Sequence, residues 1–219
     1  MHRLAIYDMD KTITRRATWT PFLRRWARRR PRSLLGLVGT VGPGALYLVK
    51  AIDRARLKEM SQRLVMGRPE KGAVERVASG YAFRVAGRVY PQARARIAAD
   101  RAAGYRIVIA TASYDFYVRP IAEALGIADV IATSSTLEDG RVLPRIAGEN
   151  CYGPAKLRMI EAWMAEQRIA RGDAEIRFYS DHVSDAPTLD WADEAFAVNP
   201  HGPLRTLAAE RGWTVLDWR

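Results

Sequence analysis

The chain has almost no cysteine and no leader-like apolar start. Cys151 is its only cysteine among 219 residues, which excludes a disulfide framework within the chain and indicates a reducing compartment. The N-terminal apolar stretch is short and ends in the carboxylates of Asp8 and Asp10, which is not the pattern of a signal peptide. The sequence also has no internal repeat and no low-complexity tract. The cytoplasm is therefore the expected compartment.

A hydrophobic run long enough to cross a membrane is also missing. The longest uncharged stretch, Ser33–Val49, would form a helix shorter than the hydrocarbon core, which is roughly 30 Å thick. Gly42-Pro43-Gly44 interrupts it. This pattern predicts two short helices joined at a Gly-Pro-Gly turn rather than one spanning helix.

Acidic residues are absent from one long segment. The net charge of the chain is +11, and no Asp or Glu lies between Asp10 and Asp53. This segment holds a cluster of arginines: Arg15, Arg16, Arg24, Arg25, Arg28, Arg29, Arg30 and Arg32. Two interpretations stay open, namely a solvated helix face and a surface that meets an anionic partner, which would be nucleic acid, a membrane or a substrate.

Short apolar runs alternate with helical patterns in the rest of the chain. Five runs predict buried strands: Leu4–Tyr7, Tyr105–Ala110, Asp129–Ala132, Ile176–Tyr179 and Ala195–Val198. Helical patterns lie between them at Gln92–Ala103, Phe116–Leu125 and Ala155–Ala170. This order predicts an α/β fold with a doubly wound, mostly parallel sheet, in which ligands bind outside the carboxyl ends of the strands.

Two segments depart from the alternation. Residues 15–89 show helical patterns and no strand, with Phe22, Leu23 and Trp26 on one face of an arginine-rich helix and further helices at Ala55–Val65 and Glu70–Val85. They are expected to form an α-helical cap on a catalytic α/β core of residues 1–14 and 90–219. Asp139-Gly140 stands between two short runs and indicates either a hairpin or a plain loop.

Polar residues follow the predicted strands. Asp8 and Asp10 come directly after the first strand, and such a pair suits a nucleophile and a proton donor, although acidic pairs are also common in loops. Thr111 ends the second strand and suits an anionic oxygen or a helix N-cap. Lys156 at a helix start opposes the helix dipole, so anion binding explains it better than local stability does. Asp181 and Asp185 suit magnesium or the first turn of a helix.

Taken in order, these four motifs resemble those of the haloacid dehalogenase superfamily of phosphatases. The stretches Gly148–Gly153 and Ala197–Leu204 are similar to the subfamily with a helical cap after the first motif, which includes phosphoserine phosphatases. The resemblance implies a Rossmann-like core, magnesium as cofactor and a phosphomonoester as substrate. It implies that Asp8 forms an aspartyl phosphate and that Asp10 acts as acid and base. The other implied contacts are to phosphoryl oxygens (Thr111 and Lys156, with Met9 and Ala112) and to Mg²⁺ (Asp8, Asp10, Asp181 and Asp185).

The sequence departs from the family pattern at three positions. Lys11 stands where many members have Gly or Ser, and Ser180 stands where many have Gly. Neither change removes a reacting group. Ala17 occupies the place where phosphoserine phosphatases commonly carry a glutamate that meets the amino group of the substrate. Phosphoserine is therefore a disfavoured substrate.

The predicted cap combines arginines with an apolar hairpin, and it looks like the caps of bacterial phosphatidylglycerophosphate phosphatases of the C type. This predicts contact with an anionic membrane surface, peripheral attachment at the inner membrane face and a lipid phosphate monoester as substrate. The competing interpretation is that the apolar run forms the core of the cap. The substrate would then be a small soluble phosphomonoester such as an amino-acid or sugar phosphate.

Two other functional classes are alternatives. Trp19, Phe22 and Trp26 among the arginines would suit stacking on nucleic-acid bases, but this interpretation leaves the carboxylates unexplained, so nucleic acid is disfavoured. A phosphotransferase or mutase, which passes the phosphoryl group to an acceptor other than water, fits the same motifs.

Overall fold

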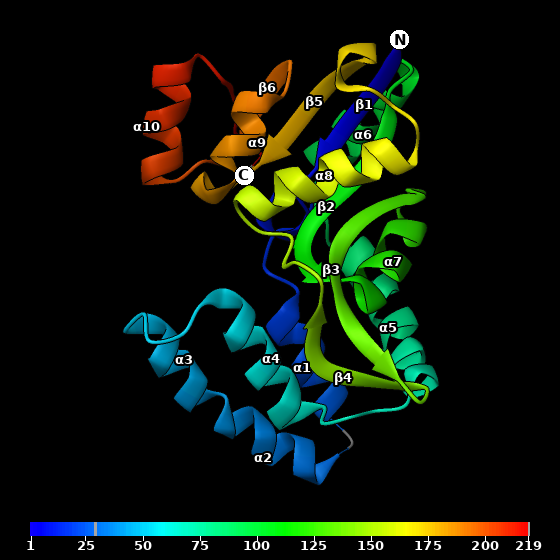
Figure 1. Cartoon of the computed structure of the whole chain (residues 1–219), viewed down its shortest axis with the longest axis vertical. Coiled ribbons are helices and arrows are strands. Elements are labelled where there is room, and N and C mark those ends of the chain that lie inside the picture. The colour runs from blue at the N-terminus through cyan, green and yellow to red at the C-terminus, as the bar shows by residue number, and fades with distance from the viewer. Residues whose placement is uncertain (29, 219) are drawn as a thin grey trace.

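A seven-stranded sheet forms the centre of the molecule (Figure 1). The computed structural model describes residues 1–28 and 30–218, so Arg29 of the arginine cluster lies outside the described residues. The strands run in the order β4-β3-β2-β1-β5-β6-β7, and every neighbouring pair is parallel except β3 and β4. Their bounds are β1 His2–Tyr7, β2 Arg106–Tyr114, β3 Asp129–Glu138, β4 Arg141–Ala147, β5 Ala174–Ser180, β6 Glu194–Val198 and β7 Thr214–Leu216. The predicted doubly wound sheet is confirmed, and β7 is a strand that the sequence analysis missed.

Helices cover both faces of the sheet because its central strands are apolar on both sides. In β1, Ala5 and Tyr7 face a cluster that includes α6 (Pro91–Ala102) and α7 (Asp115–Ala124). Leu4 and Ile6 face the opposite cluster. Three helices belong to that second layer: α8 (Pro154–Glu166), α9 (Ala186–Trp191) and α10 (Gly202–Arg211).

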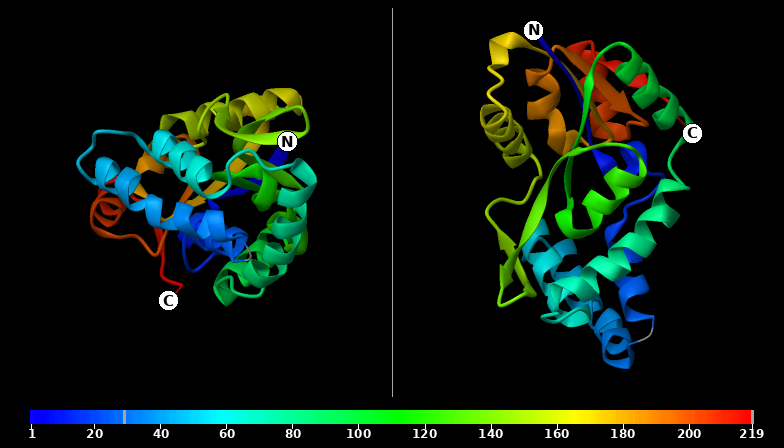
Figure 2. Two further views of the ribbon diagram at one scale, coloured as in Figure 1. Left: turned by 90° about the horizontal axis from the view of Figure 1, so that it is seen from below. Right: turned by 90° about the vertical axis from the view of Figure 1, so that its right-hand side faces the viewer.

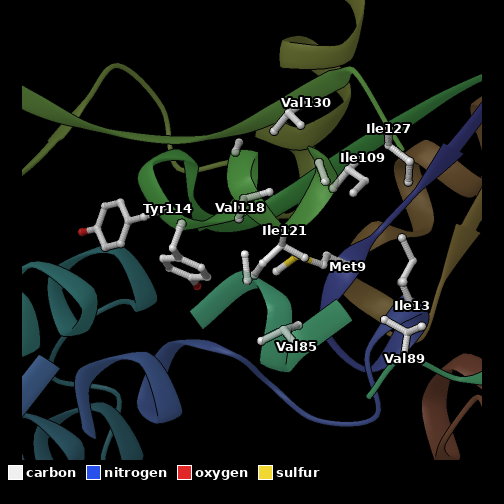
Figure 3. Packing of buried hydrophobic residues seen from close by; sticks show 14 of the residues in the cluster. Met9, Ile13, Val85, Val89, Ile109, Tyr114, Val118, Ile121, Ile127 and Val130 are labelled. Carbon is white, nitrogen blue, oxygen red and sulfur yellow. The ribbon is translucent and has the colours of Figure 1, made fainter. Parts of the chain in front are cut away.

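The first apolar layer continues past the sheet into the segment 15–89. Figure 3 shows Met9 and Ile13, which follow β1. Met9 lies close to Ile121 of α7, and Ile13 lies beside Val89, which follows α5 (Lys71–Ala86). All four side chains are buried. One continuous core therefore joins α5 to the sheet, and it fixes the chain on both sides of the first carboxylate motif.

The hairpin is confirmed and the alternative of a plain loop is wrong. β3 and β4 pair antiparallel across Asp139-Gly140. Both turn residues have positive φ, 48° at Asp139 and 69° at Gly140. Paired positive φ values give a two-residue turn whose twist matches that of the strands, and Asp-Gly tolerates them.

The segment 15–89 is helical throughout most of its length. Its helices are α1 (Trp19–Ala27), α2 (Pro31–Gly39), α3 (Val41–Leu48), α4 (Arg54–Val65) and α5. Figures 1 and 2 show α1 to α4 gathered at one end of the molecule, beyond the carboxyl ends of the strands. The segment is attached to β4 by side chains of α4, since Gln62 donates to the Leu143 carbonyl at 2.9 Å and Glu59 accepts from the Ile146 amide at 2.9 Å.

The position of the break between α2 and α3 differs from the prediction. The two helices meet at Thr40, and Gly42-Pro43-Gly44 lies within the first turn of α3. Proline is tolerated there because the amides of the first helical turn have no intrahelical acceptor. No helix in the described part of the chain is both long and apolar enough to cross a membrane.

Candidate active site

A pocket of about 380 Å³ opens where β1, β2 and β5 end. One wall, at the edge of the sheet, contains the site residues that the sequence analysis singled out: Asp8, Asp10, Thr111, Ala112, Lys156, Asp181 and Asp185. The opposite wall comes from α1, α2 and α4, and it contains Trp19, Leu23, Leu37, Thr40, Arg54, Leu57, Lys58 and Ser61. The fold thus gathers residues from four distant parts of the sequence, as the ends of parallel strands meet at one edge of a sheet.

Lys156 lies between two carboxylates at the sheet side of this pocket. Its Nζ atom is 2.9 Å from Oδ1 of Asp8 and 2.6 Å from Oδ2 of Asp185. The same oxygen of Asp185 accepts from the Ser180 hydroxyl at 2.7 Å. Lys156 is only 2% exposed although it occupies the first turn of α8. A buried cation is stable there because two anions and their hydrogen bonds compensate for lost hydration.

Burial and the mutual repulsion of the carboxylates shift their proton affinities. Burial raises the pKa of Asp8 to about 7, since Lys156 offsets it only in part and Asp185 adds to it. Burial also raises the pKa of Asp181 to about 6, against the opposing charge of Lys11. Burial alone would lower the pKa of Lys156, but Asp185 and Asp8 outweigh it and keep the ammonium charged. The site thus places three buried carboxyl groups, those of Asp8, Asp181 and Asp185, beside one buried ammonium group.

Asp10 is held by three donors. The Thr18 amide and hydroxyl donate to Oδ1 at 2.9 and 2.7 Å, and the Ser113 hydroxyl donates to Oδ2 at 2.8 Å. Burial raises the pKa of Asp10, and these hydrogen bonds oppose the shift without cancelling it. A carboxyl group that is fixed in orientation and has a raised pKa is suited to donating a proton.

The second motif sits in a bulge rather than at a strand end. Regular pairing of β2 with β3 stops at Thr111 and resumes at Tyr114, which leaves Ala112 and Ser113 unpaired in the ladder. Thr111 and Ala112 line the pocket, as the sequence analysis expected. Met9, by contrast, points its side chain into the apolar core, where it is fully buried, and it does not line the pocket (Figure 3).

The donors at this edge are of the kind that magnesium prefers. Asp8, Asp181 and Asp185 supply hard carboxylate oxygens, and Oδ1 of Asp185 is buried with no hydrogen-bond partner among the described residues. Within residues 1–28 and 30–218, no three His, Cys, Asp or Glu side chains form a ready metal cluster. Magnesium keeps several waters and commonly takes only one or two protein carboxylates together with phosphate oxygens. The residues present therefore fit such an ion.

Lys58 is a pocket residue that the sequence analysis missed. This α4 side chain is buried, and its Nζ donates to the Ala112 carbonyl and, at 2.9 Å, to Oδ1 of Asn150. Burial lowers the pKa of Lys58 to about 7. The buried positions of α4 are Lys58, Ser61, Gln62 and Val65, which have helical spacing but are mostly polar. A search for apolar periodicity cannot detect such a face.

Three further residues named in the sequence analysis lie in or near the site. Lys11 adopts φ 64°, a left-handed conformation that glycine takes without strain. Ala17 lines the pocket, so the missing glutamate leaves that wall without a carboxylate. Cys151 is buried, and burial raises its pKa to about 12, so its thiol is suited to packing rather than to nucleophilic attack.

Known proteins resemble this chain over nearly its whole length. The family model of haloacid dehalogenase-like hydrolases matches residues 5–190. The chain belongs to this family. It is 27% identical over 217 residues to a probable phosphatase of Mycobacterium tuberculosis, covering 98% of this chain and 75% of the relative. It is 26% identical over 221 residues to a phosphoserine phosphatase of the same organism, covering 98% and 70%.

A solved structure shares the complete architecture of this family member. The crystal structure of a protein with unknown function from Bordetella pertussis superposes with a TM-score of 0.89 at 28% identity, covering 100% of both chains. The haloacid dehalogenase-like fold and the phosphatase relatives agree with the carboxylates gathered at the sheet edge. The chain is a phosphomonoester hydrolase.

Proposed function

We propose that this phosphatase is magnesium-dependent and transfers the phosphoryl group through Asp8. The observation that carries the proposal is the bridge of Lys156 between Asp8 and Asp185 at the pocket wall. An ammonium group there would offset the charge of an incoming phosphate, and transfer of a phosphoryl group depends mainly on positioning and charge neutralisation. Asp8, the Asp10 carbonyl and Asp181, with Asp185 nearby, would hold Mg²⁺, which would supply further neutralising charge.

Each step uses residues at the edge of the sheet. An oxygen of Asp8 attacks phosphorus while the bond to the ester oxygen breaks, and the Asp10 carboxyl group gives its proton to that oxygen. The Asp10 carboxylate then takes a proton from water as the water oxygen attacks the aspartyl phosphate, which releases inorganic phosphate and restores Asp8. Thr111 and Lys156, with the amides around Met9 and Ala112, would bind the other phosphoryl oxygens.

The helices of residues 15–89 act in this proposal as a cap that selects the substrate, on a core of residues 1–14 and 90–219. The pocket wall from α1, α2 and α4 supports this role, since it faces the carboxylates across the cavity. The aliphatic residues of that wall, Leu23, Leu37 and Leu57, favour an ester with an apolar portion, and a lipid phosphate monoester is our leading substrate class. A small soluble phosphomonoester, of the kind named for the phosphoserine phosphatase relative, is the second candidate.

The test measures phosphate release from phosphatidylglycerophosphate in mixed micelles, phosphoserine and a chromogenic aryl phosphate, with and without magnesium. Release by the wild type is expected to require magnesium and to fall at least roughly a thousandfold in Asp8→Asn. Asp190→Asn is the matched control because Asp190 is an exposed carboxylate on α9. Full activity in Asp8→Asn would overturn the assignment of the nucleophile, and full activity after chelation of the metal would overturn the magnesium requirement.

A further inference from the structure

The outer side of α2 and α3 exposes a set of large apolar side chains. We call this set the α2–α3 face: Leu34, Leu35, Val38, Val41, Leu46, Tyr47, Leu48 and Val49. Leu35 is 75% exposed, Val38 71% and Leu48 80%. The alternative that this run forms the core of the cap is therefore wrong for these residues. Exposed apolar clusters of this size usually mark an interaction surface.

Cationic residues flank the α2–α3 face at both ends of its segment. Arg28 and Arg32 precede it, Lys50 follows it, and all three side chains are exposed. No acidic residue lies anywhere in the chain between Asp10 and Asp53. A helical surface with apolar residues flanked by cations has the chemistry of an anionic bilayer surface, where the apolar side chains enter the acyl boundary and the cations meet lipid headgroups.

The same helices reach the catalytic pocket. Leu37 and Thr40 of α2 line the cavity, while Leu35 and Val38 on α2 face solvent. Figure 1 shows α2 and α3 at the margin of the molecule, with α4 between them and the sheet. A bilayer against the outer side of α2 would therefore lie next to the wall of the pocket.

From these observations we infer that the α2–α3 face docks on an anionic lipid bilayer, with α2 and α3 lying in the plane of the interface. The charges and exposures disfavour other occupants. A symmetric second copy would bring together two faces that are both flanked by cations, with no acidic residue between Asp10 and Asp53 to pair with them, which costs free energy through repulsion. Nucleic acid presents mainly phosphates and polar base edges, which do not match a broad face of aliphatic side chains. Phe22 and Trp26 are buried and Trp19 lines the pocket, so these rings are not free to stack on bases. Docking goes beyond the proposed catalysis and does not depend on it.

Flotation with vesicles tests the docking. The full-length protein is mixed with vesicles of phosphatidylcholine alone or with an added phosphatidylglycerol fraction, and the floated amount gives a partition coefficient. The wild type is expected to float with the anionic vesicles. The triple variant Leu35→Ser, Val38→Ser, Leu48→Ser should lose at least about tenfold in partitioning, because less apolar area enters the membrane. Arg28→Gln, Arg32→Gln, Lys50→Gln should abolish the preference for anionic lipid.

Phe83→Ser is the matched control, since Phe83 is 77% exposed but lies on α5, on the other side of the molecule from α3 (Figures 1 and 2). It should float as the wild type does. The substituted side chains are exposed, so each variant should keep its melting temperature and its activity on the small aryl phosphate, which separates docking from catalysis. Flotation of the triple variant equal to that of the wild type overturns the proposal. Failure of the wild type to float also overturns it, and a dimer or an oligonucleotide complex lost in these variants would then identify the true occupant.

Discussion

The pocket wall at the sheet edge and the α2–α3 face depart from ordinary protein burial in opposite ways. At the sheet edge a lysine and three aspartates are buried, with Lys156 only 2% exposed. On the α2–α3 face aliphatic side chains are exposed, with Leu48 80% in solvent. Each arrangement costs free energy in an isolated folded chain. The first cost lies on the pocket wall at the sheet edge, and the second lies on the outer side of α2, whose Leu37 lines the same pocket. A bound substrate would offset the first cost, and the proposed bilayer would offset the second.

The largest expected effect comes from removing the cation at the sheet edge. Lys156→Met would leave Asp8 and Asp185 without their shared partner, which should lower the free energy of unfolding by about 3–5 kcal/mol in the absence of metal. Phosphate release should also be lost. Urea denaturation measures the stability. Arg211→Met is the control, because Arg211 pairs with Asp190 in solvent and should cost less than about 1 kcal/mol. Equal losses in the two variants would contradict the special role of the buried pair.

Lys58 provides a test of burial on the helical wall of the pocket, opposite Lys156. Its pKa in the folded chain is about 7, below the ordinary value of 10.5, so the folded state binds fewer protons than the unfolded state between these limits. Stability should therefore rise with pH across this window, by about 2 kcal/mol between about pH 7 and about pH 9. Lys58→Met should remove this part of the pH dependence.

The measurement for Lys58 is denaturant unfolding of wild type and variant at several pH values. The difference between the two proteins isolates Lys58 from other groups that titrate in the same range. Lys71→Met, on an exposed residue of α5, is the control and should keep the wild-type slope. A parallel pH profile for Lys58→Met and wild type would show that the pKa of Lys58 is not lowered in the folded protein.

Gly36 provides a test of the close packing of α2 against α4. A Cβ atom at this position would lie 2.0 Å from the Leu64 carbonyl oxygen, so α2 can approach α4 this closely only with glycine. Gly36→Ala should push the helices apart and destabilise the protein by about 1–3 kcal/mol. At Gly44 in α3 a Cβ would meet no atom within 4 Å, and Gly44→Ala should be neutral or stabilise by up to about 1 kcal/mol. Melting temperatures compare the two, and an unchanged value for Gly36→Ala would argue against the close contact.

The smallest expected effect concerns the backbone beside the carboxylates. Lys11 has φ 64°, so Lys11→Gly should stabilise the chain by about 1 kcal/mol by removing strain at Cβ. Lys11→Ala removes the same charge but keeps the Cβ atom, and it should give no such gain. Thermal unfolding of the two variants measures the difference. Identical melting temperatures would mean that the backbone relaxes without cost.

Local patterns in the sequence predicted much of the sheet and the residues at its edge. The runs at Leu4–Tyr7 and Ile176–Tyr179 are apolar on both faces and are followed by carboxylates, which is how buried parallel strands with a site at their ends appear in sequence. The structure places both in the centre of the sheet. β7 was missed because Thr214–Leu216 is short and largely exposed, so it lacks an apolar pattern.

Other features had no local signal. Lys58 is separated from Asn150 and Ala112 by long stretches of chain, and a lysine in a charged helix looks like any solvated lysine until those partners are known. Thr18 likewise gave no sign that its amide and hydroxyl would hold Asp10. The turn predicted at Gly42-Pro43-Gly44 was wrong because proline is accommodated equally well in the first turn of a helix.

The sequence by itself determined which residue types follow the strands and that one segment carries cations without acids, because both depend only on composition and period along the chain. Only the tertiary structure decided that Lys156 is shared by Asp8 and Asp185, that Lys58 is buried, and that Leu35 and Leu48 are exposed. Burial and pairing depend on which distant segments meet. The sequence of an apolar run is the same whether another helix packs against it or it is exposed to solvent.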